Sequence, residues 1–391
     1  MKQLGAFWVA LAACTAQRTL LLSAAGIAHA LGVASKRVPW FTTGLWWLDC
    51  WAYWDSGWLL GVAQFGYPKN PAPGSALDAY AFFPAYPLAV RLLLNLLCWP
   101  LTLPYLIVSG FVVSFTCAVL ATYVLYKIAS EQHGEYAGLF TIFAFCALPG
   151  SFYMATVYSE SLFILCILLS FYYGERNKWG RAAATCALAT ATRPLGIIVA
   201  LVLFMQYVGW VRQQSSVWKR ARAGLWMAFS PMGLILYSLY CWHRSGQLFA
   251  WSIAQRSWKR FLDWPWAGLV ESYRIIGDSA RHTLVGPRLP LFLDTVTLIL
   301  FIFLAAKLSR LNNNSYLLFV WANLLVLFFV PVHGEWPWEG AKRYVVPLFP
   351  CFMLLGLWMD LHRKLAWVLL VGSLFVQCYF FALFGLGRWV I

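Results

Sequence analysis

The sequence has 391 residues, of which 62% are hydrophobic and only 11% are charged, a composition that excludes an ordinary soluble globular protein. Repeated apolar stretches of about 20 residues predict an all-α, polytopic integral membrane protein. The net charge of +15 would suggest a nucleic-acid partner in a soluble protein. Here the positive charges lie between apolar stretches, so topology and membrane lipids explain them better and no nucleic acid is expected. No linker divides the chain, and residues 1–391 are interpreted as a single transmembrane domain.

The first apolar stretch covers residues 4–33 and is interrupted by Gln17 and Arg18. We expect Arg18 to extend toward an interface, because a charge at the bilayer centre is costly. The segment 34–98 follows and is dense in tryptophan, which predicts interfacial helices in a first extracytoplasmic segment. Prolines and polar residues in 82–98 favour an interfacial position for that stretch over a span.

The remaining apolar stretches predict most of the membrane helices, and one of them is interrupted. Arg193 and Pro194 lie near the middle of residues 182–210, where proline breaks a helix and a central arginine costs about 2.5–3.5 kcal/mol. Two short helices that meet at Arg193 remove that cost. The predicted total is about eleven transmembrane helices, with the N-terminus inside and the C-terminus outside. The stretches after residue 98 are 104–127, 137–156, 158–174, 182–210, 224–243, 289–308, 315–332, 345–360 and 365–386.

Basic residues then cluster in the loops that face the side of the N-terminus, as expected of cytoplasmic loops. The membrane would be the plasma membrane in a prokaryote or the endoplasmic reticulum membrane in a eukaryote. Residues 244–288 become a second large extracytoplasmic loop, although they contain many arginines and lysines. Either the topology differs there, or this loop binds something anionic. The basic inner loops are 176–181, 212–222, 307–310 and 363–364.

Acidic and basic residues from distant segments share the outer face in this topology. Their convergence beside a bilayer suits chemistry on a lipid-linked anionic substrate. A carboxylate can act as a general base toward a hydroxyl, and a cation can stabilise a phosphate leaving group. The outer ionisable residues are Asp49, Asp55, Asp78, Glu160, Arg193, His333, Glu335, Glu339, Lys342 and Arg343.

Three sequence blocks stand out over about residues 50–200. The first block has three parts, Trp54-Asp55-Ser56-Gly57, Gly66-Tyr67 and Ala81-Phe82-Phe83-Pro84-Ala85-Tyr86-Pro87-Leu88. The second block is Tyr158-Ser159-Glu160-Ser161-Leu162-Phe163. The third is Ala189-Thr190-Ala191-Thr192-Arg193-Pro194-Leu195-Gly196. Together the three blocks resemble the signature of the PIG-V mannosyltransferase family, in the family's order and approximate spacing. The C-terminal half is similar only loosely, through Arg343-Tyr344 before the run 347–350.

The resemblance implies a glycosyltransferase of the C superfamily, with a multi-span helical fold and a catalytic aspartate in the first outer loop. Such enzymes take the sugar from a polyprenyl-phosphate donor. The PIG-V family transfers mannose from dolichyl-phosphate mannose with inversion. The acceptor is left open between a lipid, a glycan and a protein, and membrane lipids are the other expected partners.

Asp55 is the candidate catalytic base, and Asp49 is its competitor. Charge on the departing phosphate would be met by Arg343, Arg193 or Lys342. We expect Arg343 to be a surface residue at the end of a span, where it contributes little to stability.

Three further residues are candidates for binding. Trp54 and Tyr67 are candidates to stack on a sugar ring. Glu160 either caps a helix N-terminus or has a role in the site. His333 and Glu335 could form a metal pair, but a structural role is favoured, so no cofactor is expected and a divalent metal stays open.

Two other functions compete with the transferase. A transporter or flippase would place ionisable groups near the bilayer midplane in two related halves, whereas here most of them lie at the ends of spans. The chain could also be a non-catalytic partner of a membrane enzyme that assembles glycans.

Overall fold

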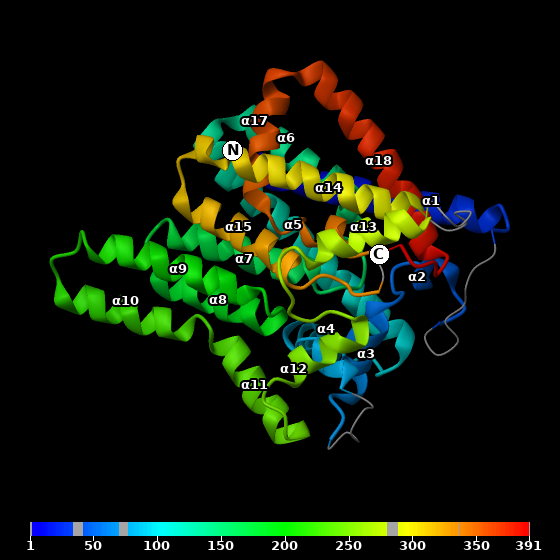
Figure 1. Cartoon of the computed structure of the whole chain (residues 1–391), viewed down its shortest axis with the longest axis horizontal. Helices are drawn as coiled ribbons and strands as arrows, with labels where there is room; N and C mark the ends of the chain where they lie inside the picture. The colour runs from blue at the N-terminus through cyan, green and yellow to red at the C-terminus, as the bar shows by residue number, and fades with distance from the viewer. Residues whose placement is uncertain (1, 34–41, 70–76, 280–287, 335, 391) are drawn as a thin grey trace.

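The computed structural model describes residues 2–33, 42–69, 77–279, 288–334 and 336–390, and these residues form helices almost throughout (Figure 1). The β-structure in this part of the chain is one antiparallel bridge between Arg260 and Val332. The α-helices are α1 (Lys2–Ala30), α2 (Trp46–Asp49), α3 (Asp55–Phe65), α4 (Ala85–Leu96), α5 (Leu103–His133), α6 (Glu135–Ala147), α7 (Glu160–Gly174), α8 (Trp179–Thr192), α9 (Gly196–Val211), α10 (Val217–Phe229), α11 (Met232–Ser245), α12 (Ala250–Ile253), α13 (Ala267–Ser279), α14 (Arg288–Lys307), α15 (Asn314–Phe329), α16 (Ala341–Tyr344), α17 (Phe349–Leu361) and α18 (Arg363–Gly385). Short 3₁₀ helices cover η1 (Asp78–Ala81), η2 (Pro149–Met154), η3 (Ala254–Trp258) and η4 (Leu308–Leu311).

Helix length and composition confirm the all-α polytopic membrane class. Five described helical stretches are long and apolar enough to cross a membrane, and six shorter apolar helices accompany them. The predicted total of about eleven spans stays a prediction. The long stretches are Gly5–Ala30, Leu103–His133, Val217–Ser245, Phe292–Leu311 and Arg363–Gly385, and the shorter helices are α4, α6, α7, α9, α15 and α17.

The predicted break at Arg193 is present. Helix α8 ends at Thr192, Arg193 adopts an extended backbone, and α9 begins at Gly196. Trp179 at the start of α8 and Trp210 near the end of α9 line one cavity, so the two helices run antiparallel as a hairpin. The hairpin places Arg193 at its tip, as the sequence predicts.

Helix α4 is likewise consistent with an interfacial segment. It has 12 residues, so it is about 18 Å long and cannot cross a hydrocarbon core of about 30 Å alone. Tyr86 and Val90 are buried on one face, while Leu88 and Leu92 are exposed on another. An apolar exposed face fits a helix that lies along a membrane surface.

The predicted span 137–156 is shorter in the structure, because α6 ends at Ala147 and η2 begins at Pro149. Helix ends leave carbonyls without partners, and buried side chains from α1 and α18 supply the missing donors here. Gln17 donates to Cys146 O at 2.7 Å, and Gln377 donates to the carbonyls of Cys146 and Leu148 at 2.9 and 2.6 Å.

The expectation that Arg18 reaches toward an interface is wrong. Arg18 is buried, and its Nη2 donates to Met154 O at 2.9 Å, while its guanidinium lies 4.8 Å from the centroid of the Phe115 ring. Carbonyl and aromatic partners replace water around the charge. Arg18 therefore anchors the last residue of η2.

The core lies where α5, α6, α7 and α17 pack together, and α8 packs on the far side of α7. Helix α17 approaches α6 closely, because a Cβ at Gly356 would lie 2.1 Å from Thr141 Oγ1. Helix α7 is largely buried and starts at Glu160, so its N-terminus carries an acidic residue into the interior.

Polar contacts join the loops at the other end of α7. Arg176 forms an ion pair with Glu131, Asn313 donates to Glu175 Oε1 at 3.3 Å, and Gln132 donates to the hydroxyl of Tyr316 at 2.8 Å. These loops are among those predicted to face the cytoplasm. They share one end of the molecule, opposite the end that contains Glu160 and Arg193.

Two arginines of the segment 244–288 bind backbone carbonyls of other predicted outer segments. Arg244 donates to Tyr67 O, and Arg260 donates to Glu339 O, both at 2.6 Å. The segment has many more basic residues than an extracytoplasmic loop is expected to have. Two of these residues are therefore explained by hydrogen bonds to carbonyls within the protein.

Candidate active site

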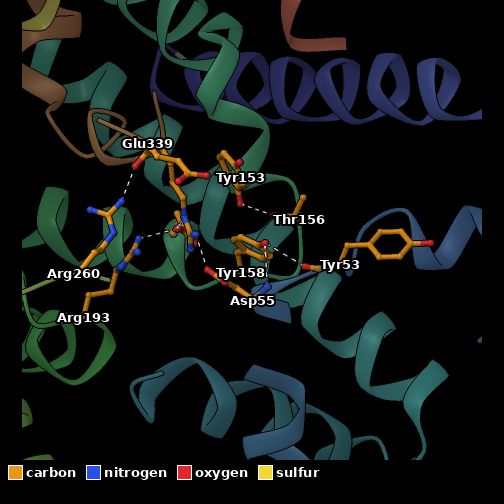
Figure 2. A network of polar contacts seen from close by, with 10 residues as sticks. Tyr53, Asp55, Tyr153, Thr156, Tyr158, Arg193, Arg260 and Glu339 are labelled. Carbon is orange, nitrogen blue, oxygen red and sulfur yellow. Dashed lines mark hydrogen bonds and ion pairs between the residues drawn. The ribbon is translucent and has the colours of Figure 1, made fainter. Parts of the chain in front are cut away.

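Four ionisable side chains from four distant segments form one continuous network at the end of the molecule where α7 begins (Figure 2). Arg343 on α16 donates from Nη1 to Asp55 Oδ2 at 2.6 Å, and from Nε to Glu160 Oε1. Arg193 donates from Nη1 to the same Glu160 oxygen at 2.8 Å. Negative and positive side chains therefore alternate in this network, in the order Asp55, Arg343, Glu160 and Arg193. The structure thus joins four residues that the sequence assigns to separate outer segments.

Burial differs sharply along the network. The Glu160 side chain is 0% exposed, and its Oε2 has no hydrogen-bond partner among the described residues. Asp55 and Arg193 are 15% and 16% exposed, so the two ends of the network are open to a ligand while its middle is closed. A buried carboxylate is tolerated only when it is paired, which explains why Glu160 contacts two arginines.

Arg343 holds the network together electrostatically. Burial disfavours its charged form, but the carboxylates of Glu160 and Asp55 outweigh burial and raise the pKa of the guanidinium well above its ordinary value. Its guanidinium carbon also lies 4.6 Å from the centroid of the Tyr158 ring and 5.2 Å from that of Tyr153. Arg343 is therefore a buried residue, and the expectation of a surface arginine is wrong.

The backbone around Asp55 is unusual. Trp54, the residue before α3, has a φ of 58°, a left-handed conformation that a bulky residue rarely adopts. Its indole Nε1 donates to Arg388 O at 3.2 Å, and its ring packs edge-on against Trp389 with centroids 4.7 Å apart. These contacts hold the strained residue and direct the Asp55 carboxylate at the start of the helix toward Arg343.

Tyr158 links Asp55 to the turn before α7. Its hydroxyl accepts a hydrogen bond from Asp55 N at 3.3 Å and donates to Tyr53 O at 3.2 Å. Burial, with a smaller contribution from the Asp55 carboxylate, raises the pKa of Tyr158 well above its ordinary value, so this hydroxyl stays protonated. Tyr158 belongs to the block Tyr158-Ser159-Glu160, but sequence reasoning assigned a role only to Glu160.

Lys342 is next to Arg343 in sequence but has a different partner. Its side chain is 0% exposed, and Nζ donates to Asp294 Oδ2 on α14 at 3.0 Å. The same carboxylate accepts hydrogen bonds from the backbone N–H groups of Gly340 and Lys342 at 3.2 and 2.9 Å. This pair attaches the turn that carries Arg343 to α14, and the ammonium points at a carboxylate rather than at an open surface.

A close backbone contact fixes the same turn from the other side. A Cβ at Gly150, in η2, would lie 1.8 Å from Lys342 O, so this position has no space for a side chain. Tyr153 follows on η2, and its buried hydroxyl has no hydrogen-bond partner among the described residues. The α6–η2 break therefore brings a glycine and a tyrosine to the site.

Tyr67 and Asp49 make structural contacts away from the ion network. The Tyr67 hydroxyl donates to Phe82 O at 2.6 Å, and its ring packs in a separate cluster with Tyr80 and Tyr237. Asp49 accepts from Thr43 N, Thr43 Oγ1 and Gly44 N at 2.9, 2.7 and 3.0 Å. Asp49 thus closes the turn before α2, and its oxygens are already occupied.

The candidate metal pair is only partly described, because Glu335 lies outside the described residues. His333 stacks on Phe261 with ring centroids 3.8 Å apart, and its Nε2 lies 3.7 Å from Asp263 Oδ2. Within the described ranges, no three His, Cys, Asp or Glu side chains gather in a group that could hold a metal ion.

Sequence reasoning missed Asp294, although a signal for it was present. An acidic residue inside an apolar stretch predicts a paired or functional group, because an isolated carboxylate is costly there. The stretch 289–308 contains this aspartate near its outer end. Its partner, Lys342, is 48 residues away, and spacing alone does not identify it.

A helical fold with several apolar helices long enough to cross a membrane defines a polytopic membrane protein, and its buried acid–base network is the candidate active site. The family described as mannosyltransferase (PIG-V) matches residues 14–241, more than half of the chain. The chain therefore belongs to the PIG-V family of mannosyltransferases, as its motifs predict. No curated protein matches the sequence.

Three solved structures are similar to this chain at low identity. ArnT from Cupriavidus metallidurans, bound to undecaprenyl phosphate, is 15% identical with a TM-score of 0.49, over 84% of this chain and 60% of that chain. The Archaeoglobus fulgidus oligosaccharyltransferase in complex with Zn and sulfate is 15% identical with a TM-score of 0.45, over 94% and 53% of the two chains. AglB from the same organism, with an inhibitory peptide and a dolichol-phosphate, is 12% identical with a TM-score of 0.45, over 95% and 56%. The chain thus spans between about half and three fifths of the length of these structures.

Proposed function

We propose that this protein transfers a mannose-type sugar from a polyprenyl-phosphate donor to a hydroxyl of an acceptor, with Asp55 as the general base. The family assignment supports the reaction class and favours an enzyme over the transporter and partner alternatives. The observation that carries the proposal is the contact between Asp55 and Arg343, which places a partly exposed carboxylate beside a buried cation. Base and phosphate-stabilising groups are the two elements that this transfer needs.

The reaction is a single inverting displacement. The acceptor oxygen attacks C1 of the sugar as its proton passes to Asp55. The bond between C1 and the phosphate oxygen breaks, and its electron pair stays on the phosphate. The products are the mannosylated acceptor and polyprenyl phosphate, which gains one negative charge. No covalent enzyme intermediate forms in this step.

The arginines have different capacities to bind that phosphate. Arg343 uses Nε and Nη1 on the two carboxylates, so two of its three guanidinium nitrogens are engaged. Arg193 uses only Nη1, and its Nε and Nη2 donate to no atom of the described residues. We therefore assign the direct phosphate contact to Arg193 and assign Arg343 to holding Asp55 and Glu160 in position. Arg193 and Asp55 then flank the sugar from the two open ends of the network.

Trp54 and Tyr153 complete the proposed site. Trp54 precedes Asp55 and is partly exposed, so its ring is available to a sugar. The hydroxyl of Tyr153 and Oε2 of Glu160 are buried polar atoms around Arg343, and neither has a hydrogen-bond partner among the described residues. Tyr67 and Lys342 have internal partners, and we assign them to the support of the site.

The distribution of basic residues supports an extracytoplasmic or lumenal site. Loops rich in Lys and Arg lie at the end opposite Asp55, which is the pattern of cytoplasmic loops. A lipid-linked donor reaches such a site by diffusing in the membrane.

The test is donor turnover by the purified full chain. Radiolabelled polyprenyl-phosphate mannose is incubated with the enzyme and a membrane extract of the source cell as acceptor, and release of polyprenyl phosphate is measured beside transfer of label. GDP-mannose replaces the lipid donor in a parallel reaction. We expect turnover of the lipid donor alone, and a product with the anomeric configuration inverted. Turnover of GDP-mannose without the lipid donor would overturn the proposal, and retention of configuration would overturn the single displacement.

A further inference from the structure

The cavity lined by Trp179 and Trp210 lies at the opposite end of α8 from Arg193. Its volume is about 350 Å³, and it opens between the start of α8, the end of α9 and the middle of α10. Figure 1 shows these three helices packed together. Helix α8 has 14 residues, so this cavity lies about 21 Å from the ion network. It is therefore separate from the proposed active site. Its lining residues are Asn177, Lys178, Trp179, Gly180, Arg181, Trp210, Lys219, Arg222, Ala223 and Trp226.

The cavity is strongly basic. Four of its lining residues are cations and none is acidic. Two acidic residues lie at the same end of the molecule as the cavity, and both have other partners. Glu131 forms an ion pair with Arg176, and Glu175 accepts a hydrogen bond from Asn313. Lys178, Arg181, Lys219 and Arg222 form no ion pair with a carboxylate in the described parts of the chain. The positive potential is thus left for an external anion.

A buried hydrogen-bond donor in the cavity lacks an acceptor. Trp179 is only 6% exposed, and its indole Nε1 has no hydrogen-bond partner among the described residues. An unsatisfied buried N–H costs free energy, so such a donor calls for a ligand atom or an ordered solvent molecule. Trp179 lines the cavity, so the cavity combines a buried, unpaired N–H donor with the four basic residues.

The backbone provides further donors at the same place. Helix α8 begins at Trp179, and the residue before it, Lys178, makes no side-chain cap. The first N–H groups of a helix have no partner within the helix, and the helix dipole favours an anion there. Backbone N–H groups, an indole N–H and four cations together suit a phosphate, which offers several acceptor oxygens and negative charge.

The surroundings of the cavity indicate where this phosphate comes from. Trp218 and Leu225 are exposed on α10 beside the cavity, and Trp226 lines it with its ring partly exposed. Exposed tryptophan and leucine next to basic residues are typical of the headgroup level of a membrane. A zwitterionic headgroup would bring an amine into a site that holds four cations and no carboxylate. We propose that this cavity binds the phosphate of an anionic phospholipid, in the leaflet opposite the active site.

Lipid binding to the purified full chain in detergent tests the proposal. Native mass spectrometry measures the retention of dioleoylphosphatidylglycerol and of dioleoylphosphatidylcholine in parallel titrations. We expect tighter binding of the anionic lipid. Lys219→Gln/Arg222→Gln should weaken phosphatidylglycerol binding by roughly 30-fold, about fivefold for each basic residue removed near an anionic lipid. The matched control Arg212→Gln/Lys364→Gln removes two exposed charges from loops of the predicted cytoplasmic side, and it should change binding by less than about threefold.

Trp179→Phe removes the buried N–H donor and keeps a smaller aromatic ring in its place. We expect the unliganded variant to unfold thermally at or above the wild-type temperature, because an unsatisfied N–H is lost, while the stabilisation by phosphatidylglycerol decreases. Equal weakening by the two double variants would mean diffuse surface attraction and would overturn the site. Equal binding of the two lipids would also overturn it. Inorganic phosphate or glycerol 3-phosphate that displaces the lipid at equal concentration would make the ligand a soluble phosphate and refute the lipid assignment.

Discussion

The guanidinium of Arg343 contacts the carboxylate of Asp55 across 2.6 Å, although the two residues are 288 positions apart in sequence. The contact joins the start of α3 to α16 and so connects the first and last of the predicted outer segments. A catalytic carboxylate needs a fixed position relative to its substrate. In the proposed mechanism, Arg343 gives Asp55 this fixed position and keeps it next to the cations that would meet a phosphate.

Asp55→Asn should lower donor turnover by about 10²–10⁴-fold, the usual range for the loss of a general base. The amide keeps the shape of the side chain but removes its capacity to accept a proton at neutral pH. Donor binding should change much less, because the phosphate is bound by cations. Turnover and donor affinity are measured separately with labelled donor.

Asp78→Asn is the matched control for Asp55→Asn. Asp78 lies in the same outer segment as Asp55, and it accepts a hydrogen bond from Ser257 Oγ at 2.5 Å. It takes no part in the ion network, so Asp78→Asn should keep near-wild-type turnover. Asp49→Asn is a poor control, because one of its oxygens accepts two hydrogen bonds and the other accepts a third. Near-full activity of Asp55→Asn would remove Asp55 from the mechanism.

Arg343→Ala should abolish activity and also destabilise the protein, because it leaves Asp55 without its partner and Glu160 with only Arg193. Removing one partner of a buried ion pair costs about 3–5 kcal/mol. Arg343→Lys should restore stability in part, since an ammonium cannot bridge two carboxylates with the geometry of a guanidinium. Thermal unfolding in detergent and donor turnover are recorded for both variants.

Arg193→Ala separates phosphate binding from positioning. Arg193 is partly exposed and contacts one carboxylate, so the loss of stability should be smaller than for Arg343→Ala. We expect the apparent KM for the lipid donor to rise about tenfold or more, as for the loss of a charge-assisted hydrogen bond to phosphate. A wild-type KM in Arg193→Ala, with a raised KM in Arg343→Lys, would transfer the phosphate contact to Arg343.

Lys342→Met should destabilise the protein by about 3–5 kcal/mol, because the buried carboxyl group of Asp294 would lose its ammonium partner. The double variant Lys342→Met/Asp294→Asn should recover part of this loss, since it removes the uncompensated charge. Thermal unfolding of both single variants and the double variant completes the cycle. Additive losses would show that the two side chains are not coupled.

Gly150→Ala should reduce activity although Gly150 lies outside the ion network. The added methyl group would overlap Lys342 O, so the turn that carries Arg343 must shift. A misplacement of about 1 Å at a catalytic group can cost about 100-fold in rate. Gly372→Ala is the control, because nothing lies within 4 Å of a Cβ at that position. Wild-type turnover of Gly150→Ala would mean that the turn adjusts freely.

The topology is tested with reporter tags or single introduced cysteines. Positions near Asn177 and Ser216 should face the cytoplasm, and a position near Trp338 should face the outside. The polar contacts that join Glu131 to Arg176 and Glu175 to Asn313 already place several of the predicted inner loops at one end. Labelling of Ser216 from the outside would reverse the orientation and move the active site to the cytoplasm.

Much of the site could be predicted from sequence because membrane helices restrict where ionisable residues lie. Long apolar stretches have to be helices in lipid, so charged residues collect at helix ends, and alternate ends share one side of the membrane. This logic placed Asp55, Glu160, Arg193 and Arg343 on one face, and Pro194 marked the break in the helix that positions Arg193. The PIG-V motifs added the family and the candidate base.

Tertiary structure alone decided which of these residues are buried and which partners they choose. Lys342 and Arg343 are adjacent in sequence, yet Lys342 binds Asp294 while Arg343 binds Asp55 and Glu160. Arg18, expected at an interface, binds a carbonyl in the core. Such choices depend on which helix ends meet across the bundle, and in a low-dielectric interior each charge must find the nearest group that can neutralise or solvate it. Spacing along the chain determines which end of the molecule a residue occupies, whereas the packing of the helices determines its neighbours there.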